Sequence, residues 1–152
     1  MRRVAMVAAA LAGVAVFTTG AFSEEDPIKA RKALMKDIVG PSAKLGGQMI
    51  KGDVPFDAAK ASEAMTAIQG VPDKYVLLFP EGTGMEADPE TEASPRIWED
   101  FDGFTTLAMK LKDEAGKAVA AAQQGEGAFR AAFTDLTKNC KNCHESFRVK
   151  RE

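Results

Sequence analysis

Cys140, Cys143 and His144 are the only cysteines and the only histidine of the chain, and they fall within one short run. The two thiols are three residues apart, so each can add to one of the two vinyl groups of a haem, and the adjacent imidazole can bind the iron. On a helix the three positions share one face. The run therefore predicts one covalently attached haem c, with Cys140 and Cys143 as thioether anchors and His144 as the proximal axial iron ligand.

Two other uses of this run are weaker. A structural zinc ion takes four ligands, and the chain has no further cysteine or histidine to complete the set. A redox-active dithiol does not need the histidine and is typical of a βαβ setting. The motif therefore favours haem c and its iron.

The first 23 residues resemble an export signal. Arg2 and Arg3 precede an almost wholly apolar stretch over 4–17, and the small residues Ala21 and Ser23 satisfy the rule for signal-peptidase cleavage before Glu24. The apolar run is too short for a transmembrane anchor. We therefore expect residues 1–23 to be a cleaved signal peptide and residues 24–152 to form one periplasmic domain with no membrane span.

The charge balance excludes some classes of partner. The chain has 20 basic and 22 acidic residues, and loss of Arg2 and Arg3 leaves 18 against 22, a net charge of −4. An acidic chain is a poor ligand for nucleic acid or an anionic membrane surface. The C-terminal stretch is more basic, at Lys138, Lys141, Arg148, Lys150 and Arg151. We interpret these cations as favourable partners of a helix C-terminus, with a docking patch for an acidic redox partner as the alternative.

Helical periodicity explains the rest of the chain between its glycines and prolines. Caps and spacing predict helices over residues 26–50, 57–70, 94–122 and 128–147. Gly40-Pro41 predicts a kink in the first helix. The connection over 70–94 is expected to lack regular structure because of its glycines and prolines, with Leu77, Leu78 and Phe79 folded inward.

The fourth predicted helix carries the haem ligands on its apolar face. Steps of four and three residues link Phe129, Phe133, Leu136, Cys140, Cys143, His144 and Phe147. The inner face of the third helix is expected to comprise Ile97, Trp98, Phe101, Phe104, Leu107, Met109 and Leu111. A seam of this kind faces other helices. The predicted fold is therefore all-α, an antiparallel four-helix bundle with the covalently bound haem c against its inner surface.

The position of the haem motif resembles that in class II cytochromes c, the family of cytochrome c′ and the low-spin cytochromes c-556. Only eight residues follow His144, whereas most small cytochromes c carry the motif near the N-terminus. Further similar segments cover the mature chain: residues 31–35, 51–57, 91–98 and 140–148. Lys32 departs from the glutamine common in the family. The stretch from Met35 to Phe56 is one residue longer than usual, and we expect Gly40-Pro41 to absorb that residue.

Other site residues follow from the resemblance alone. It implies that Arg31 pairs with a haem propionate, that Thr91 and Glu92 contact the haem, and that Arg148 screens the proximal imidazole. An exposed arginine on an amphipathic helix is the alternative for Arg31, and a helix-end cation is the alternative for Arg148. Met35 holds the family's distal position, either as sixth iron ligand or packed over an open site. The methionines at 49, 65 and 109 are expected to fill the core.

The two states of Met35 correspond to two functions. Ligation predicts a six-coordinate, low-spin haem and a one-electron carrier that cycles between Fe(III) and Fe(II) with periplasmic redox proteins or membrane electron-transfer complexes. An open position predicts a five-coordinate, high-spin cytochrome c′ that binds nitric oxide or carbon monoxide. We favour the carrier, and neither reading is an enzyme. A peroxidase is disfavoured because the only histidine is already the proximal ligand. The resemblance also allows a homodimer through the first helix.

Overall fold

The structure is a computed structural model that describes residues 26–149. The predicted signal peptide lies outside these residues, as do Lys150 and Arg151. The described chain forms α1 Pro27–Ala33, the π-helix η1 Leu34–Val39, α2 Gly40–Lys51, α3 Ala58–Gln69, α4 Pro72–Tyr75, the 3₁₀-helix η2 Val76–Leu78, α5 Arg96–Glu99, α6 Phe101–Ala122 and α7 Glu126–Phe147. Within it, no helix has the length and hydropathy needed to cross a bilayer.

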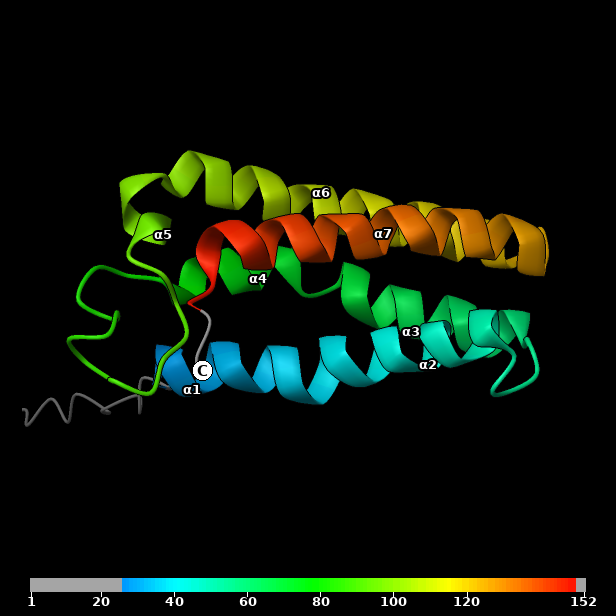
Figure 1. Cartoon of the computed structure of the whole chain (residues 1–152), viewed down its shortest axis with the longest axis horizontal. Coiled ribbons are helices and arrows are strands. Elements are labelled where there is room, and N and C mark those ends of the chain that lie inside the picture. Colours follow the sequence, from blue (N-terminus) through cyan, green and yellow to red (C-terminus); the bar gives the residue numbers. More distant parts are fainter. Residues whose placement is uncertain (1–25, 150–152) are drawn as a thin grey trace, which may run out of the picture.

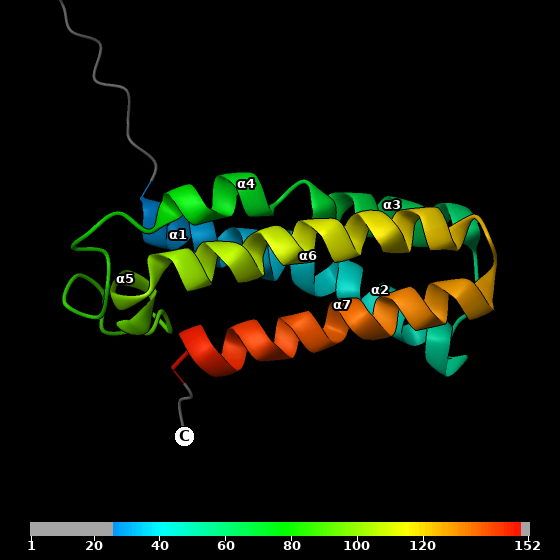
Figure 2. The same ribbon diagram turned by 90° about the horizontal axis from the view of Figure 1, so that it is seen from above.

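The helices pack as a bundle. In Figure 1, α1, η1 and α2 run end to end as one rod, α3 and α4 follow one another along a second, and α6 and α7 lie beside each other above them. Figure 2 shows α7 returning along α6. The prediction of an all-α, antiparallel four-helix bundle is confirmed.

Local chemistry sets several of the helix ends. The Asp26 carboxylate accepts a hydrogen bond from the backbone N–H of Ile28 at 2.9 Å, and the Asp57 carboxylate accepts one from Lys60 at 3.0 Å. Both aspartates occupy the N-cap, where such side chains replace missing backbone partners. Gly125, with φ of 108°, makes the turn between α6 and α7 in a conformation that favours glycine.

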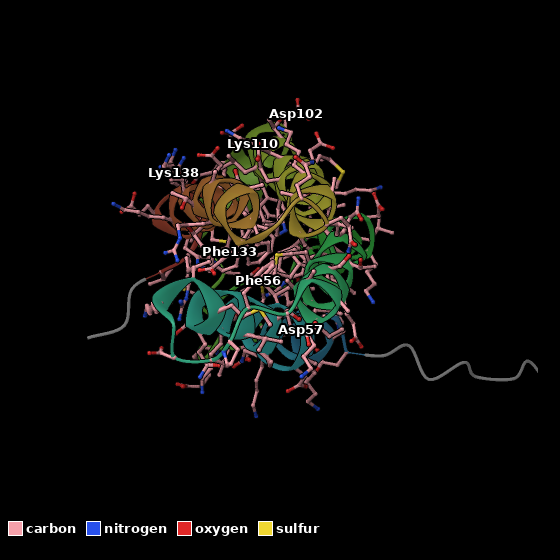
Figure 3. The ribbon with its side chains drawn as sticks, turned by 90° about the vertical axis from the view of Figure 1, so that its right-hand side faces the viewer. Phe56, Asp57, Asp102, Lys110, Phe133 and Lys138 are labelled. Carbon is pink, nitrogen blue, oxygen red and sulfur yellow. The ribbon has the colours of Figure 1, made fainter. Side chains whose placement is uncertain are left out.

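Two buried clusters form the interior. The first, which we call the Met65 core, comprises Met49, Ala61, Ala64, Met65, Ile68, Ala115, Ala118, Ala122, Phe129, Phe133 and Leu136. The second, the Phe104 core, comprises Phe79, Ala93, Ile97, Phe104 and Phe147. Figure 3, a view along the bundle, shows Phe56 and Phe133 pointing between the helices, whereas Asp102, Lys110 and Lys138 lie outside. The expected core positions of Met49 and Met65 are confirmed by their burial.

The connection over 70–94 is more ordered than predicted. Pro72 begins α4, and η2 follows directly. Phe79 is buried as expected, but the expectation for Leu77 is wrong, because its side chain is 77% exposed. Successive side chains of a 3₁₀ turn point in three directions. Val76 and Leu78 pack against the Phe104 core, and Leu77 is left facing solvent.

The third and fourth helices begin differently from the prediction. Asp100 leaves the helical region with φ of −136° and separates α5 from α6, and its carboxylate accepts a hydrogen bond from Gly103 N–H at 3.0 Å. This break changes the phase of the stripe, so Phe101 is 42% exposed and its expected inward position is wrong. The fourth helix, α7, begins at Glu126, two residues earlier than expected.

The kink expected at Gly40-Pro41 falls at the end of a π-helix. The backbone stays in the right-handed helical region on both sides of η1, at Ala33 and at Gly40. The chain therefore continues as one helical rod whose middle, η1, is a π-helix, and a π-turn is a recognised cause of a helix kink (Figure 1).

Candidate haem-binding site

The last turns of α7 carry the haem motif. Cys140 and Cys143 are half-buried, and His144 follows within the same helix, which continues to Phe147. The helix is anchored on both sides of the motif, because Leu136 is fully buried in the Met65 core and Phe147 is buried in the Phe104 core. The inward seam predicted for this helix is confirmed at its phenylalanines and its leucine.

A pocket lies beside the motif. It is partly open to solvent, and its surface is nearly all apolar. The lining residues come from η1, α4, α6, α7 and the residue before α4: Met35, Val39, Val71, Pro72, Tyr75, Phe104, Leu107, Ala108, Leu111, Asn139, Cys140, Cys143 and His144. An apolar lining of this kind suits a largely hydrophobic ligand. The residues present therefore fit haem c: thiols to hold it, an imidazole for the iron, and apolar walls for the ring.

The ionisation of the motif distinguishes it from a redox dithiol. Burial raises the pKa of the Cys143 thiol to about 11, and the neighbouring Cys140 adds to the shift. Burial also raises the pKa of Cys140. Redox-active dithiols require the opposite, a lowered pKa. Although His144 is exposed as a residue, partial desolvation of its imidazole lowers the pKa of His144, and the Arg148 cation lowers it further, which favours the neutral imidazole that metal ligation needs.

Sequence reasoning missed two polar residues of the pocket. Asn139 is 2% exposed, and its Nδ2 donates a hydrogen bond to the backbone carbonyl of Leu107 at 3.0 Å, which ties α7 to α6. Its Oδ1 is buried and has no partner in the described part of the chain. Tyr75 is a second case, and burial raises its pKa to about 12. The position of Asn139 directly before Cys140 could have revealed it, whereas Tyr75 reaches the pocket only through tertiary packing.

Comparison with known proteins identifies the family. The sequence profile described as Cytochrome C′ matches residues 26–148. The chain belongs to the cytochrome c′ family. It is 36% identical over 148 residues to a cytochrome c′ of Rhodopseudomonas palustris, covering 94% of this chain and 96% of the relative. It is 32% identical over 124 residues to a cytochrome c-556 of Agrobacterium tumefaciens strain II Chrys, covering 82% and 98%.

A solved structure agrees with this assignment. A nitric oxide complex of a variant cytochrome c prime from Alcaligenes xylosoxidans has a TM-score of 0.71 and 28% identity, over 83% of this chain and 96% of that chain. The resemblance to class II cytochromes c is therefore confirmed. Haem c with its iron is the cofactor of the cytochrome c′ family, and that prediction is confirmed as well.

Within this cytochrome c′ fold, Arg31 is not the exposed arginine that one reading expected, since it is only 3% exposed. Its guanidinium donates hydrogen bonds to the carbonyls of Leu78 at 3.1 Å and Thr83 at 2.6 Å, and to the hydroxyls of Thr83 at 3.1 Å and Thr91 at 2.9 Å. It also lies 4.5 Å from the centre of the Phe79 ring. Arg31 therefore organises the connection between η2 and α5, and its pairing with a haem propionate stays a prediction.

Glu92 and Arg148 fasten the end of α7 to that connection. Arg148 Nε donates to the Glu92 carboxylate at 2.6 Å. Backbone bonds from Val149 N–H to the Glu92 carbonyl at 2.8 Å, and from Ser94 N–H to the Phe147 carbonyl at 3.0 Å, lie on either side. The side chain of Arg148 is thus an ion-pair partner as well as a neighbour of the motif. Haem contact by Thr91 and Glu92, and screening of the imidazole by Arg148, stay predictions.

The basic residues of α7 are paired with acidic ones. Lys138 lies 2.9 Å from Asp135 and Lys141 lies 3.7 Å from Glu145. Pairing within the helix favours the interpretation as solvated helix-end cations over that of a docking patch.

Proposed function

We propose that this protein is a periplasmic one-electron carrier in which His144 and Met35 are the two axial ligands of the haem iron. The observation that supports it is that Met35 and His144 line one apolar pocket from different elements, η1 and α7. In Figure 1 the rod that contains η1 lies below the end of α7. Haem c supplies the one-electron Fe(III)/Fe(II) couple when bound.

The side chains divide the remaining work. Cys140 and Cys143 would hold the haem by thioether bonds, and the neutral imidazole of His144 would supply a nitrogen ligand to its iron. The thioether of Met35 is a soft, uncharged ligand, which raises the reduction potential in His/Met cytochromes. The apolar walls place few polar groups beside the haem that would have to rearrange when the charge changes.

A second function uses the same pocket. The similar structure from Alcaligenes xylosoxidans is a nitric oxide complex. If Met35 packs over the iron without binding it, its half-buried side chain and the apolar walls would form a distal face selective for small uncharged gases. Nitric oxide and carbon monoxide are then the ligands, and the haem is five-coordinate and high spin.

Optical spectra of the ferric and ferrous holoprotein, with and without carbon monoxide, separate the two functions. Met35→Leu keeps an apolar side chain of similar volume and removes the sulfur. The matched control is Met49→Leu, a buried methionine in the same rod that does not line the pocket. We expect low-spin bands indifferent to carbon monoxide in wild type and Met49→Leu, and a high-spin, carbon monoxide-reactive spectrum in Met35→Leu. A wild-type spectrum that is already high spin and shifts with carbon monoxide would overturn the carrier.

Export and assembly belong to the same proposal. We place the mature protein in the periplasm after cleavage before Glu24, with periplasmic redox proteins or membrane electron-transfer complexes as partners and a homodimer as its assembly. Intact mass of the periplasmic protein tests the cleavage site and the single haem. Sedimentation of the holoprotein tests the dimer, and a monomer at all concentrations would contradict it.

A further inference from the structure

The rod that carries Met35 is α-helical at both ends and π-helical between them. In η1 the Gly40 N–H donates to the carbonyl of Met35, five residues earlier, instead of to the residue four earlier. A π-turn of this kind accommodates one extra residue in a helix, and such turns occur frequently at functional sites. This one ends at Gly40, directly before Pro41, within the stretch from Met35 to Phe56 that we expect to be one residue longer than in the family.

Two adjacent residues favour the wide turn. A Cβ at Gly40 would lie 3.0 Å from the Met35 carbonyl oxygen, so glycine lets that carbonyl turn in toward the chain. Pro41 has no N–H to donate in a regular α-helix, and its ring would meet the carbonyl of Asp37 four residues before it. Both residues therefore act against a continuous α-helix.

The two halves of the rod have separate partners. Upstream, Arg31 binds the connection between η2 and α5, and Met35 lines the pocket. Downstream, a Cβ at Gly46 would lie 2.4 Å from the Phe133 ring, which shows how closely α2 meets α7, and Met49 is buried. A regular α-helix through the same residues would rotate one half relative to the other by about 100°, the turn of one residue. Arg31 and Met35 would then leave their partners.

We infer that η1, held open by Gly40 and Pro41, is the device that orients Met35 into the haem pocket. The inference rests on the proposed function only in placing Met35 on the distal side of the haem. It makes Gly40 and Pro41 positioning residues, although neither lines the pocket.

The test compares three variants of the holoprotein. Gly40→Ala with Pro41→Ala supplies two good helix formers and an N–H, and so favours a regular helix that still contains the extra residue. The same pair combined with deletion of the exposed Asp37 gives a regular helix without it. Gly47→Ala is the matched control, because it is a helical glycine of the same rod whose Cβ would meet nothing within 4 Å.

The readout is the nuclear magnetic resonance shift of the Met35 methyl group in the diamagnetic ferrous protein, or its carbon monoxide complex if the iron takes that gas. The haem ring current shifts a methyl above it whether or not the sulfur binds iron. We expect the shift to persist in Gly47→Ala, to be largely lost in Gly40→Ala/Pro41→Ala, and to return when Asp37 is also deleted.

Several results would overturn the inference. An unchanged chemical shift of the Met35 methyl in Gly40→Ala/Pro41→Ala would show that the wide turn does not orient this residue. Failure of the Asp37 deletion to restore the shift would show that the extra residue does not set the rotation of one half of the rod relative to the other. If the double variant does not fold, recovery of a folded haem protein with the shifted methyl on deletion supports the inference, and continued failure contradicts it. A high-spin wild type would overturn the electron carrier and leave this comparison intact.

Discussion

The two ends of the bundle bury apolar surface in different ways. In the Met65 core, at what we call the closed end, the side chains pack against one another, and no surface is exposed on Ala61, Met65, Ile68 or Phe129. The Phe104 core instead borders a pocket with apolar walls that is partly open to solvent. Protein interiors are normally packed as densely as organic crystals. The comparison places the haem motif at the end of the bundle where the apolar cluster lines a pocket, whereas the Met65 core is closely packed.

The largest expected effect comes from preventing haem attachment. Cys140→Ser with Cys143→Ser removes both thioether bonds, and without haem the pocket walls face water. We expect the free energy of unfolding to fall by about 5 kcal/mol or more, which is comparable with the whole stability of a small domain. Amide exchange should show lost protection in α4, α5 and the end of α7, with α3 and the first half of α7 retaining more. Equal loss at both ends would contradict the division of the interior.

Arg31→Met tests the connection at the haem end. Methionine keeps the apolar stem and removes four hydrogen bonds and the cation over Phe79. We expect the free energy of unfolding of the holoprotein in urea to fall by about 2–4 kcal/mol, because the carbonyls of Leu78 and Thr83 and the hydroxyls of Thr83 and Thr91 lose a charged donor inside the protein. Lys32→Met is the control, since its pair with Asp88 is partly exposed to solvent and is worth about 0–1 kcal/mol. Equal effects of the two substitutions would mean that the buried network is not what stabilises the connection.

At the closed end, Gly46→Ala and Gly47→Ala form a matched pair. The new Cβ at Gly46 would lie 2.4 Å from the Phe133 ring, whereas at Gly47 it meets nothing within 4 Å. We expect Gly46→Ala to destabilise by about 1–3 kcal/mol through overpacking. Gly47→Ala should stabilise by up to about 1 kcal/mol through helix propensity. Denaturant midpoints measure both, and the haem spectrum should stay unchanged in each, because the close contact is with the Met65 core.

The sequence predicted the closed end better than the haem end. The α7 seam and the Asp26 and Asp57 caps follow from local spacing and side-chain chemistry, so they were predictable. The cysteine pair and histidine were predictable too, because haem attachment requires them to be neighbours.

The haem end depends on contacts between distant segments. The exposure of Leu77 and the break at Asp100 depend on short turns whose direction is set by packing against α6 and α7. The bonds from Arg31 to Thr83 and Thr91 join residues more than 50 positions apart. Helical periodicity carries no information about such pairs, and a π-turn interrupts the very period on which the prediction relied.

The smallest expected effect concerns the reduction potential. The buried Oδ1 of Asn139 has no partner in the described chain and belongs to a residue that lines the pocket. Its partial negative charge favours the ferric state, so Asn139→Leu should raise the potential by roughly 20–60 mV, equivalent to about 0.5–1.4 kcal/mol for one electron. Redox titration of the holoprotein measures this.

Thr105→Val provides the control, because the Thr105 hydroxyl is also buried and without a partner among residues 26–149, yet Thr105 does not line the pocket. Its potential should stay close to that of wild type. A fall in potential in Asn139→Leu, or an equal rise in both variants, would show that the amide oxygen does not act on the iron. A rise in Asn139→Leu alone would mean that Asn139, a polar pocket residue hydrogen-bonded to α6, sets part of the reduction potential of the haem.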